Sequence, residues 1–254
     1  MSGFFVAPEN VSEDTILISG SDVNHIKNVM RMKAGDVLNV SDGTGFTYAC
    51  ELLGFEEDGI CLKILSREFS GSELKTKISL FQGLPKKDKM ELIIQKAVEL
   101  GVYEIYPVIN ERTIVKIDEK KIKSKVERWN KISEAAAKQS GRAIIPVIHE
   151  PIKFNKALTL ATEKCNTVLI PYENADGMGY SDRCLDEAVH ADSSAIFIGP
   201  EGGFSMEEVD LAKEANAKVI SLGSRILRTE TAGMTVLSIM MFKAEQLEAE
   251  TLKE

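Results

Sequence analysis

Short hydrophobic runs separated by polar turns make up the first part of the chain, a pattern typical of β-strands. The runs cover residues 4–6, 15–18, 37–40, 46–53 and 60–65. Asp42-Gly43 and Asp58-Gly59 are pairs that favour tight turns between strands. An amphipathic helix is predicted at 21–32, with Ser21 or Asp22 as its N-cap. The pattern predicts a small β-barrel-like domain over residues 1–70.

The pattern changes after a polar stretch at 66–76, which we interpret as a linker. Predicted strands and helices then alternate, as is typical of a parallel sheet covered by helices. We therefore predict an α/β domain over residues 71–254. Its strands are predicted at 77–82, 102–108, 144–148, 166–170, 195–198 and 218–222, and its helices at 89–100, 118–140, 155–163, after Ser205, and from Thr229 or Thr231, either of which can cap it, to about 246.

Two turns rich in glycine follow the last two predicted strands. Residues 196–205 read Ile-Phe-Ile-Gly-Pro-Glu-Gly-Gly-Phe-Ser, and residues 219–233 read Val-Ile-Ser-Leu-Gly-Ser-Arg-Ile-Leu-Arg-Thr-Glu-Thr-Ala-Gly. Glycine lets the backbone take positive φ or lets a ligand approach it closely. Ser205 and Glu208 form a capping box, which starts a helix directly after the first turn. A third loop follows the strand at 166–170. Turns at neighbouring strand ends are where open α/β sheets bind ligands, so the sequence predicts a ligand site there.

These turns resemble the signature loops of the SPOUT methyltransferases and, within them, of the RsmE-type enzymes, which use S-adenosylmethionine to methylate N3 of a uridine in 16S, small-subunit ribosomal RNA. The strings at 84–102 and 134–142 resemble the same family, and residues 25–36 resemble its PUA-like RNA-binding domain. The resemblance implies a PUA-like β-barrel followed by a SPOUT domain with a parallel sheet and a trefoil knot. It also implies a homodimer that acts on 16S ribosomal RNA or the small ribosomal subunit.

The resemblance implies a set of cofactor-binding residues in the strand-end loops. We expect Leu222, Ile226 and Leu227 to contact the adenine ring, and the glycines to leave room for the rest of the cofactor. Glu201 is expected near the methionine part, where it meets either the ribose hydroxyls or the ammonium group. The full predicted set is Ile170, Ile198, Gly199, Glu201, Gly202, Gly203, Ser221, Leu222, Gly223, Ile226, Leu227 and Arg228.

Methyl transfer to N3 of uridine requires loss of the imide proton, so a base, or a cation that stabilises the developing oxyanions, is needed. Arg228 is the leading candidate for the cation. Glu230 and Glu173 are candidate bases or orienting groups. The alternative is that these charges form a salt bridge that only holds the loop.

The formal net charge is −8, but it is unevenly distributed: residues 1–72, 73–150 and 151–254 carry −6, +5 and −7. A basic run on the helix at 118–140 is either a solvated face or a rail for the RNA backbone. The predicted RNA-binding residues, taken from the family strings and the basic segment, are His25, Arg31, Lys33, Lys86, Gln139 and Arg142.

Several classes of protein are disfavoured. The chain has no apolar run long enough to span a membrane, no secretory signal and no metal-binding constellation, and its four cysteines form no C-x-x-C pair. We therefore expect a cytoplasmic protein without metal. No G-x-G-x-x-G opens a helix after a strand, which argues against a dehydrogenase. Another SPOUT activity, on a different RNA or on a ribose 2′-hydroxyl, and a noncatalytic RNA-binding module remain as alternatives.

Overall fold

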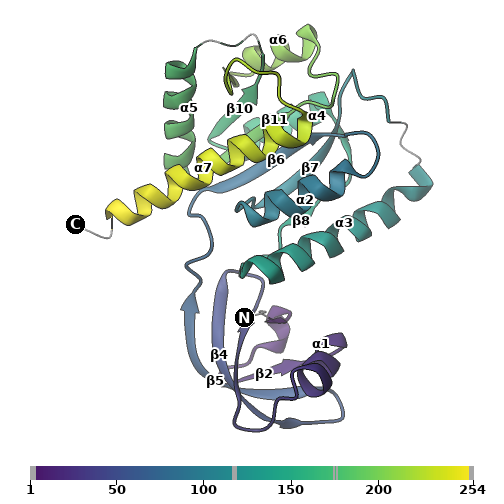
Figure 1. Cartoon of the computed structure of the whole chain (residues 1–254), viewed down its shortest axis with the longest axis vertical. Coiled ribbons are helices and arrows are strands. Elements are labelled where there is room, and N and C mark those ends of the chain that lie inside the picture. Colours follow the sequence, from purple (N-terminus) through teal and green to yellow (C-terminus); the bar gives the residue numbers. More distant parts are fainter. Residues whose placement is uncertain (1–3, 116–118, 174, 176, 252–254) are drawn as a thin grey trace. The chain divides into compact units, whose positions relative to one another are not determined.

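The computed structural model describes residues 4–115, 119–173, 175 and 177–251 (Figure 1). The contacts divide the chain into two units. The first consists of Met1–Glu73 and Ala137–Ile145, and the second of Leu74–Ala136 and Pro146–Glu254. The first unit therefore includes a segment from the middle of the chain, which lies outside the predicted range of 1–70.

The first unit is built on one curled sheet with the strand order β1-β3-β4-β5-β2. Only β1 and β3 are parallel among its pairs. Alternate residues of β4, such as Tyr48, Cys50 and Leu52, are buried, so one face of the sheet forms the core. Its strands are β1 (Phe4–Phe5), β2 (Thr15–Ile18), β3 (Val37–Ser41), β4 (Phe46–Phe55) and β5 (Ile60–Phe69), with a 3-10 turn, η1, at Pro8–Asn10.

Two predictions in this unit are wrong in their boundaries. The predicted helix at 21–32 is a short α1 (Ser21–Asn24) followed by a π-helical turn, η2 (His25–Val29), and it starts from Gly20 without a side-chain cap. It ends early because Arg31 has a φ of 55°, which is incompatible with a continuing helix. The predicted linker at 66–76 begins too early, since β5 continues to Phe69.

The second unit is built on a parallel sheet with the order β12-β10-β11-β6-β7-β8, and β9 also pairs with β7. The predicted α/β class is confirmed. The strands are β6 (Lys77–Gly83), β7 (Glu104–Ile109), β8 (Val147–Ile148), β9 (Ile152–Lys153), β10 (Thr167–Pro171), β11 (Ser193–Ile198) and β12 (Lys218–Ile220). The helices are α2 (Lys89–Glu99), α3 (Glu119–Ser140), α4 (Phe154–Lys164), α5 (Met178–His190), α6 (Met206–Glu214) and α7 (Thr229–Thr251).

Both faces of this sheet are covered. On one face, Phe81 stacks on Tyr106 and on Phe197, with centroid distances of 4.7 and 4.6 Å, and residues of α4 and α6 complete the core. On the other face, α7 crosses in front of the sheet and packs on α2 and α5 (Figure 1). The predicted start of α3 at Asp118 lies outside the described residues. The predicted trefoil knot stays a prediction.

The strand order brings three strand ends together. β10 lies between β11 and β12, and all three run in the same direction. Their carboxyl ends therefore meet at one edge of the sheet, as the sequence predicted.

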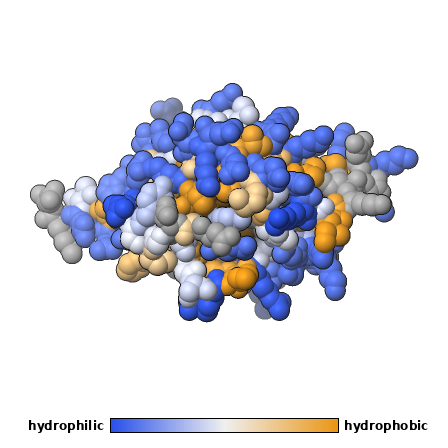
Figure 2. Space-filling view, turned by 90° about the horizontal axis from the view of Figure 1, so that it is seen from above, coloured by the Kyte–Doolittle hydropathy of each residue, from blue (hydrophilic) through white to orange (hydrophobic). Residues whose placement is uncertain are grey.

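In the view from above, hydrophilic residues dominate the visible face and hydrophobic ones form small patches (Figure 2). Within the described residues, no helix is both long enough and apolar enough to cross a membrane.

Candidate active site

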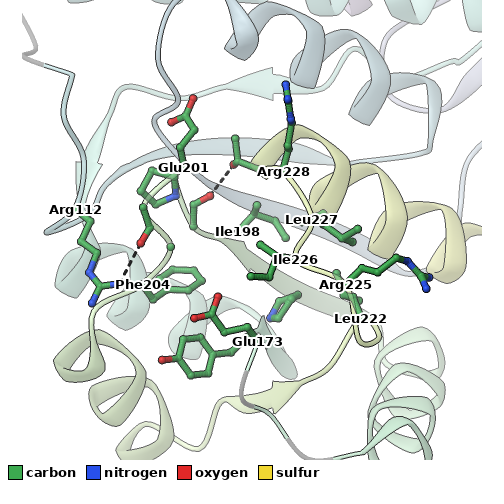
Figure 3. Close-up of a pocket in the computed structure, with 18 of the residues that line it drawn as sticks. Arg112, Glu173, Ile198, Glu201, Phe204, Leu222, Arg225, Ile226, Leu227 and Arg228 are labelled. Atoms are coloured by element: carbon green, nitrogen blue, oxygen red, sulfur yellow. Dashed lines mark hydrogen bonds between the residues drawn. The ribbon is translucent and has the colours of Figure 1, made fainter.

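A cavity of about 490 Å³ lies at this edge of the sheet (Figure 3). The loops after β10, β11 and β12 supply most of its walls, and the first residues of α7 close it. The residues that line it are Lys89, Arg112, Pro171, Tyr172, Glu173, Ile198, Gly199, Pro200, Glu201, Gly202, Gly203, Phe204, Leu222, Gly223, Arg225, Ile226, Leu227, Arg228, Thr229 and Ala232.

The loop at 199–203, which we call the glycine loop, is tightly folded. A Cβ atom at Gly199 would lie 3.1 Å from the backbone of Gly203, and Gly203 itself has a φ of 66°. Behind the loop, a Cβ atom at Gly83 would lie 2.5 Å from the nitrogen of Pro200. A side chain at Gly83 would therefore push the glycine loop away from the end of β6, one at Gly199 would crowd the loop, and the positive φ of Gly203 favours glycine.

Side chains from distant parts of the chain hold the glycine loop. The Thr229 hydroxyl donates to the Gly199 carbonyl at 2.6 Å, and Arg112 Nη1 donates to the Gly202 carbonyl at 3.1 Å, as the dashed lines in Figure 3 mark. The predicted capping box between Ser205 and Glu208 is confirmed, and it starts α6 directly after the loop. The Thr229 hydroxyl donates to the glycine loop and does not act as the predicted N-cap of α7, which begins at this residue.

A group of charges joins the glycine loop to α2 and α7. Lys89 Nζ lies 3.4 Å from a carboxylate oxygen of Glu201 and 3.1 Å from one of Glu230, and the backbone N–H of Lys86 donates to Glu201 at 3.1 Å. Burial alone would raise the pKa of each carboxyl group, but backbone hydrogen bonds and Lys89 hold the pKa of Glu201 and of Glu230 below the usual value. Both groups are therefore ionised at neutral pH.

The middle of the cavity is apolar. Figure 3 shows Ile198, Ile226 and Leu227 gathered there, with Phe204 beside them, while Arg225 and Arg228 extend outward. Ile226 is 87% exposed, although isoleucine is among the residues most often buried. This combination of an apolar surface, a glycine loop and surrounding cations suits a ligand with a flat apolar ring and polar ends.

Comparisons with known proteins agree with this geometry. Residues 72–241 match the family model of the RNA methyltransferase domain, and residues 18–65 match that of the RNA methyltransferase PUA domain. The chain belongs to the RNA methyltransferase family. Its first unit is accordingly PUA-like.

Relatives cover nearly the whole chain. Ribosomal RNA small subunit methyltransferase E of Bacillus subtilis is 37% identical over 238 residues, 92% of each chain. A crystal structure of a ribosomal RNA small subunit methyltransferase E from Neisseria gonorrhoeae, bound to S-adenosyl methionine, has a TM-score of 0.80 at 32% identity over 95% of this chain and 97% of that one. A Legionella pneumophila methyltransferase in complex with SAM has a TM-score of 0.78 at 31% identity, over 95% and 97%.

In this RNA methyltransferase, the structure brings most of the predicted cofactor residues into one cavity. All of them line it except Ile170, which is fully buried in the core beneath, and Ser221, whose backbone N–H donates to Ser181 Oγ at 2.8 Å. Among the predicted catalytic residues, Glu173 and Arg228 line the cavity. Glu230 lies outside the lining and pairs with Lys89.

The predicted RNA-binding residues are divided between the two units, with Lys86 alone in the second. His25, Arg31, Lys33, Lys86 and Gln139 are exposed. The prediction for Arg142 is wrong: its side chain is 4% exposed and its Nη2 lies 2.6 Å from Glu73, whose other oxygen accepts from the backbone N–H of Ala143. Arg142 closes a buried ion pair within the first unit, which leaves its guanidinium inaccessible to RNA.

Several residues of the cavity were not among the predicted site residues. Lys89 and Arg112 come from α2 and from the loop after β7, far from the glycine-rich turns in sequence. Tyr172 and Phe204 are next in sequence to predicted site residues, so their place in the chain could have indicated that they line the cavity. Within the described residues, no group of three or more histidine, cysteine, aspartate or glutamate side chains is placed to hold a metal ion.

Proposed function

We propose that this protein methylates N3 of a specific uridine in 16S ribosomal RNA of the small ribosomal subunit, with S-adenosylmethionine as the methyl donor. The observation that carries the proposal is the single cavity formed by three strand-end loops, in which the glycine loop faces an apolar surface. The relatives named as small-subunit ribosomal RNA methyltransferases, one of them solved with S-adenosyl methionine, support it.

The residues of the cavity fit this cofactor. Leu222, Ile226 and Leu227 offer apolar surface for the adenine ring, and the glycine loop leaves room for the ribose and methionine parts. Glu201 already accepts a hydrogen bond from the backbone N–H of Lys86 and forms an ion pair with Lys89, so we assign it first to fixing the loop and second to contacting the cofactor. S-adenosylmethionine supplies the electrophilic methyl group, and the chain supplies its alignment.

The RNA side of the reaction needs a group that favours loss of the N3 proton. We assign Arg228 to stabilising the negative charge that develops on the uracil oxygens, because it lies at the cavity and carries a permanent charge. Glu173 is the better candidate base, since it also lines the cavity. Glu230 is an orienting group, because its lowered pKa and its pairing with Lys89 make it a weak proton acceptor.

We further propose a cytoplasmic homodimer. The cytoplasmic location is supported by the proposed substrate, because ribosomal RNA lies in the cytoplasm. For the homodimer, α7 carries the apolar residues Val236 and Met240, but both are buried within the chain. Phe242, which is 66% exposed on the same helix, is instead available. Sedimentation equilibrium at micromolar concentration tests this, and a species with only the mass of one chain contradicts it.

Transfer of a labelled methyl group tests the proposed reaction. Small subunits from a strain that lacks its own uridine N3 methyltransferase, and naked 16S RNA beside them, are incubated with labelled S-adenosylmethionine and digested to nucleosides. We expect label only in 3-methyluridine, and a loss of at least about a hundredfold in kcat with Arg228→Gln, the scale of removing one oxyanion-stabilising donor. Label in another nucleoside supports a different activity of the same family.

A further inference from the structure

A chain of hydrogen bonds links Gln82, which lies outside the cavity lining, to two residues that line the cavity, Thr229 and Gly199. Gln82 Nε2 donates to Thr229 Oγ1 at 2.9 Å and to the Gly83 carbonyl at 2.9 Å. The Thr229 hydroxyl in turn donates to the Gly199 carbonyl at 2.6 Å. Gln82 is fully buried and Thr229 is 5% exposed, so water does not compete for these bonds.

The three residues come from three segments whose relative positions shape the cavity. Gln82 lies near the end of β6, Gly199 opens the glycine loop, and Thr229 is the first residue of α7, directly after the second loop at 221–228. The Thr229 hydroxyl therefore connects the glycine loop directly to the residue that follows the second loop.

The Gly199 carbonyl is a particularly effective place to hold the glycine loop. Its peptide partner is the nitrogen of Pro200, which carries no hydrogen. The carbonyl is thus the only hydrogen-bonding group on that peptide unit, and the bond from Thr229 sets its orientation. The contact of Pro200 with Gly83, the residue after Gln82, positions the other side of the same peptide unit.

The buried amide of Gln82 lowers the stability of the fold, which indicates that its N–H donors serve a purpose. Among the described residues, Gln82 Oε1 has no hydrogen-bond partner, and an unsatisfied buried acceptor is destabilising. An apolar side chain of similar size would avoid this cost but would leave Thr229 Oγ1 without its donor. Because the Gln82 amide donates to Thr229 Oγ1, the single proton of the threonine hydroxyl is directed at the Gly199 carbonyl.

We propose that Gln82 and Thr229 are positioning residues, which hold the glycine loop and the second loop in the arrangement that binds S-adenosylmethionine. The inference rests on the proposed function and deepens it, because it assigns the preorganisation of the cofactor site to the hydrogen bonds that Gln82 and Thr229 make. Without the hydroxyl, a smaller fraction of the protein has both loops in the binding-competent arrangement. The apparent Kd rises in inverse proportion to that fraction.

The test is a matched pair of substitutions at one position, Thr229→Val and Thr229→Ser, with the Kd for S-adenosylmethionine measured by calorimetry. Thr229→Val keeps the shape but removes the hydroxyl, and we expect the Kd to rise about tenfold, which corresponds to the cost of one unmet buried hydrogen bond. Thr229→Ser restores the hydroxyl and is expected to stay within about twofold of wild type. Thr162→Val, which removes a threonine bond to the backbone of α4 away from the cavity, is the control.

Kinetics separate positioning from a merely structural role. We expect Thr229→Val to raise the KM for S-adenosylmethionine with little change in kcat, and to show the same raised Kd at temperatures where it is fully folded. A lowered kcat with an unchanged KM, or a lower melting temperature with an unchanged Kd, overturns the inference. So does a Thr162→Val variant that weakens binding as much.

A second variant covers the case in which Thr229→Val does not fold. Gln82→Met removes the buried amide, and we expect a rise in Kd of about threefold, because the threonine keeps its bond but loses its orientation. Where the double variant, with both Gln82→Met and Thr229→Val, folds, its effect on Kd is expected to equal that of Thr229→Val alone. The reason is that both changes break the same chain of hydrogen bonds. Full additivity, or no effect of Gln82→Met, overturns the inference. Wild-type protein that transfers no methyl group and binds no cofactor overturns the proposed function as well.

Discussion

In the parallel sheet of the second unit, the amino ends and the carboxyl ends of the strands are built differently. We call these two sides of the sheet the amino edge and the carboxyl edge. At the amino edge, Glu104 accepts hydrogen bonds from Ser79 at 2.9 Å and from Tyr106 at 2.8 Å, and it lies 2.8 Å from His149 Nε2. Lys164 completes this amino-edge cluster by donating to Tyr106. At the carboxyl edge, glycines replace such side chains and a cavity is left. One sheet thus has a filled edge that stabilises it and an open edge that binds.

The two edges also differ in how their charges are used. Burial alone would raise the pKa of Glu104, but hydrogen bonds from His149, Tyr106 and Ser79 lower it to about 2. Side chains supply all three of these hydrogen bonds. At the carboxyl edge, Glu201 accepts backbone bonds and pairs with a lysine that also contacts α7. The amino edge is expected to govern folding, and the carboxyl edge to govern binding.

Replacement of Glu104 is expected to have the largest effect on the free energy of unfolding. Glu104→Gln keeps the shape but loses the charge, and we expect a loss of about 3 kcal/mol at pH 7, the scale that a pKa shift of this size implies. The folded pKa is depressed, so the stabilisation is fully present above the unfolded value of 4.5 and is lost as the pH falls toward about 2. Denaturant unfolding between pH 7 and pH 3 measures it.

Glu104→Gln is also expected to bind S-adenosylmethionine as wild type does. A Kd within about twofold of wild type, measured where both proteins are folded, is the expected result, because Glu104 lies at the edge away from the cavity. A difference in stability between wild type and Glu104→Gln that stays constant down to pH 3 contradicts the assigned role of the charge.

Gly83 tests the open edge and is expected to have the next largest effect. Gly83→Ala places a Cβ atom 2.5 Å from the nitrogen of Pro200 and 2.8 Å from Asn110 Oδ1, so the backbone of the glycine loop must move. We expect a loss of about 2 kcal/mol in the free energy of unfolding, the usual scale of overpacking, and at least about tenfold weaker S-adenosylmethionine binding. Gly54→Ala, where the added atom meets nothing within 4 Å, is the matched control.

The sequence predicted those features of the two units that depend on local pattern. β2 occupies the predicted residues 15–18, and the capping box at Ser205 and Glu208 is present, because alternation and cap spacing are local properties. Glycine-rich turns after successive strands indicated the cavity for a similar reason: strand direction alone brings their ends together.

The pattern could not show which distant side chains meet. The bonds from Gln82 to Thr229 and from Arg142 to Glu73 join residues 147 and 69 positions apart. Such pairings depend on the finished packing, so a buried arginine was mistaken for an RNA contact. The amino-edge cluster was missed for the same reason, since Glu104, His149 and Lys164 are unremarkable charges in the sequence. Two-residue strands such as β9 are too short to leave a periodic pattern.

Ile226 is expected to show the smallest effect on folding together with a clear effect on binding. Its side chain is 87% exposed, so Ile226→Ala changes the free energy of unfolding by less than about 0.5 kcal/mol. It lines the apolar middle of the cavity, where a bound adenine ring would cover it. Loss of that burial costs more than about 1 kcal/mol, so calorimetry is expected to show roughly tenfold weaker S-adenosylmethionine binding.

The control for this change is another exposed isoleucine. Ile114 is 69% exposed and lies outside the cavity lining, so Ile114→Ala is expected to change neither stability nor affinity. Equal affinities for Ile226→Ala and wild type would place the adenine ring elsewhere, and the exposure of a large apolar side chain at the open edge would then have no ligand to explain it. A loss of affinity without a loss of stability is the opposite of the result expected for Glu104→Gln. The two substitutions together therefore decide whether folding and binding are divided between the two edges.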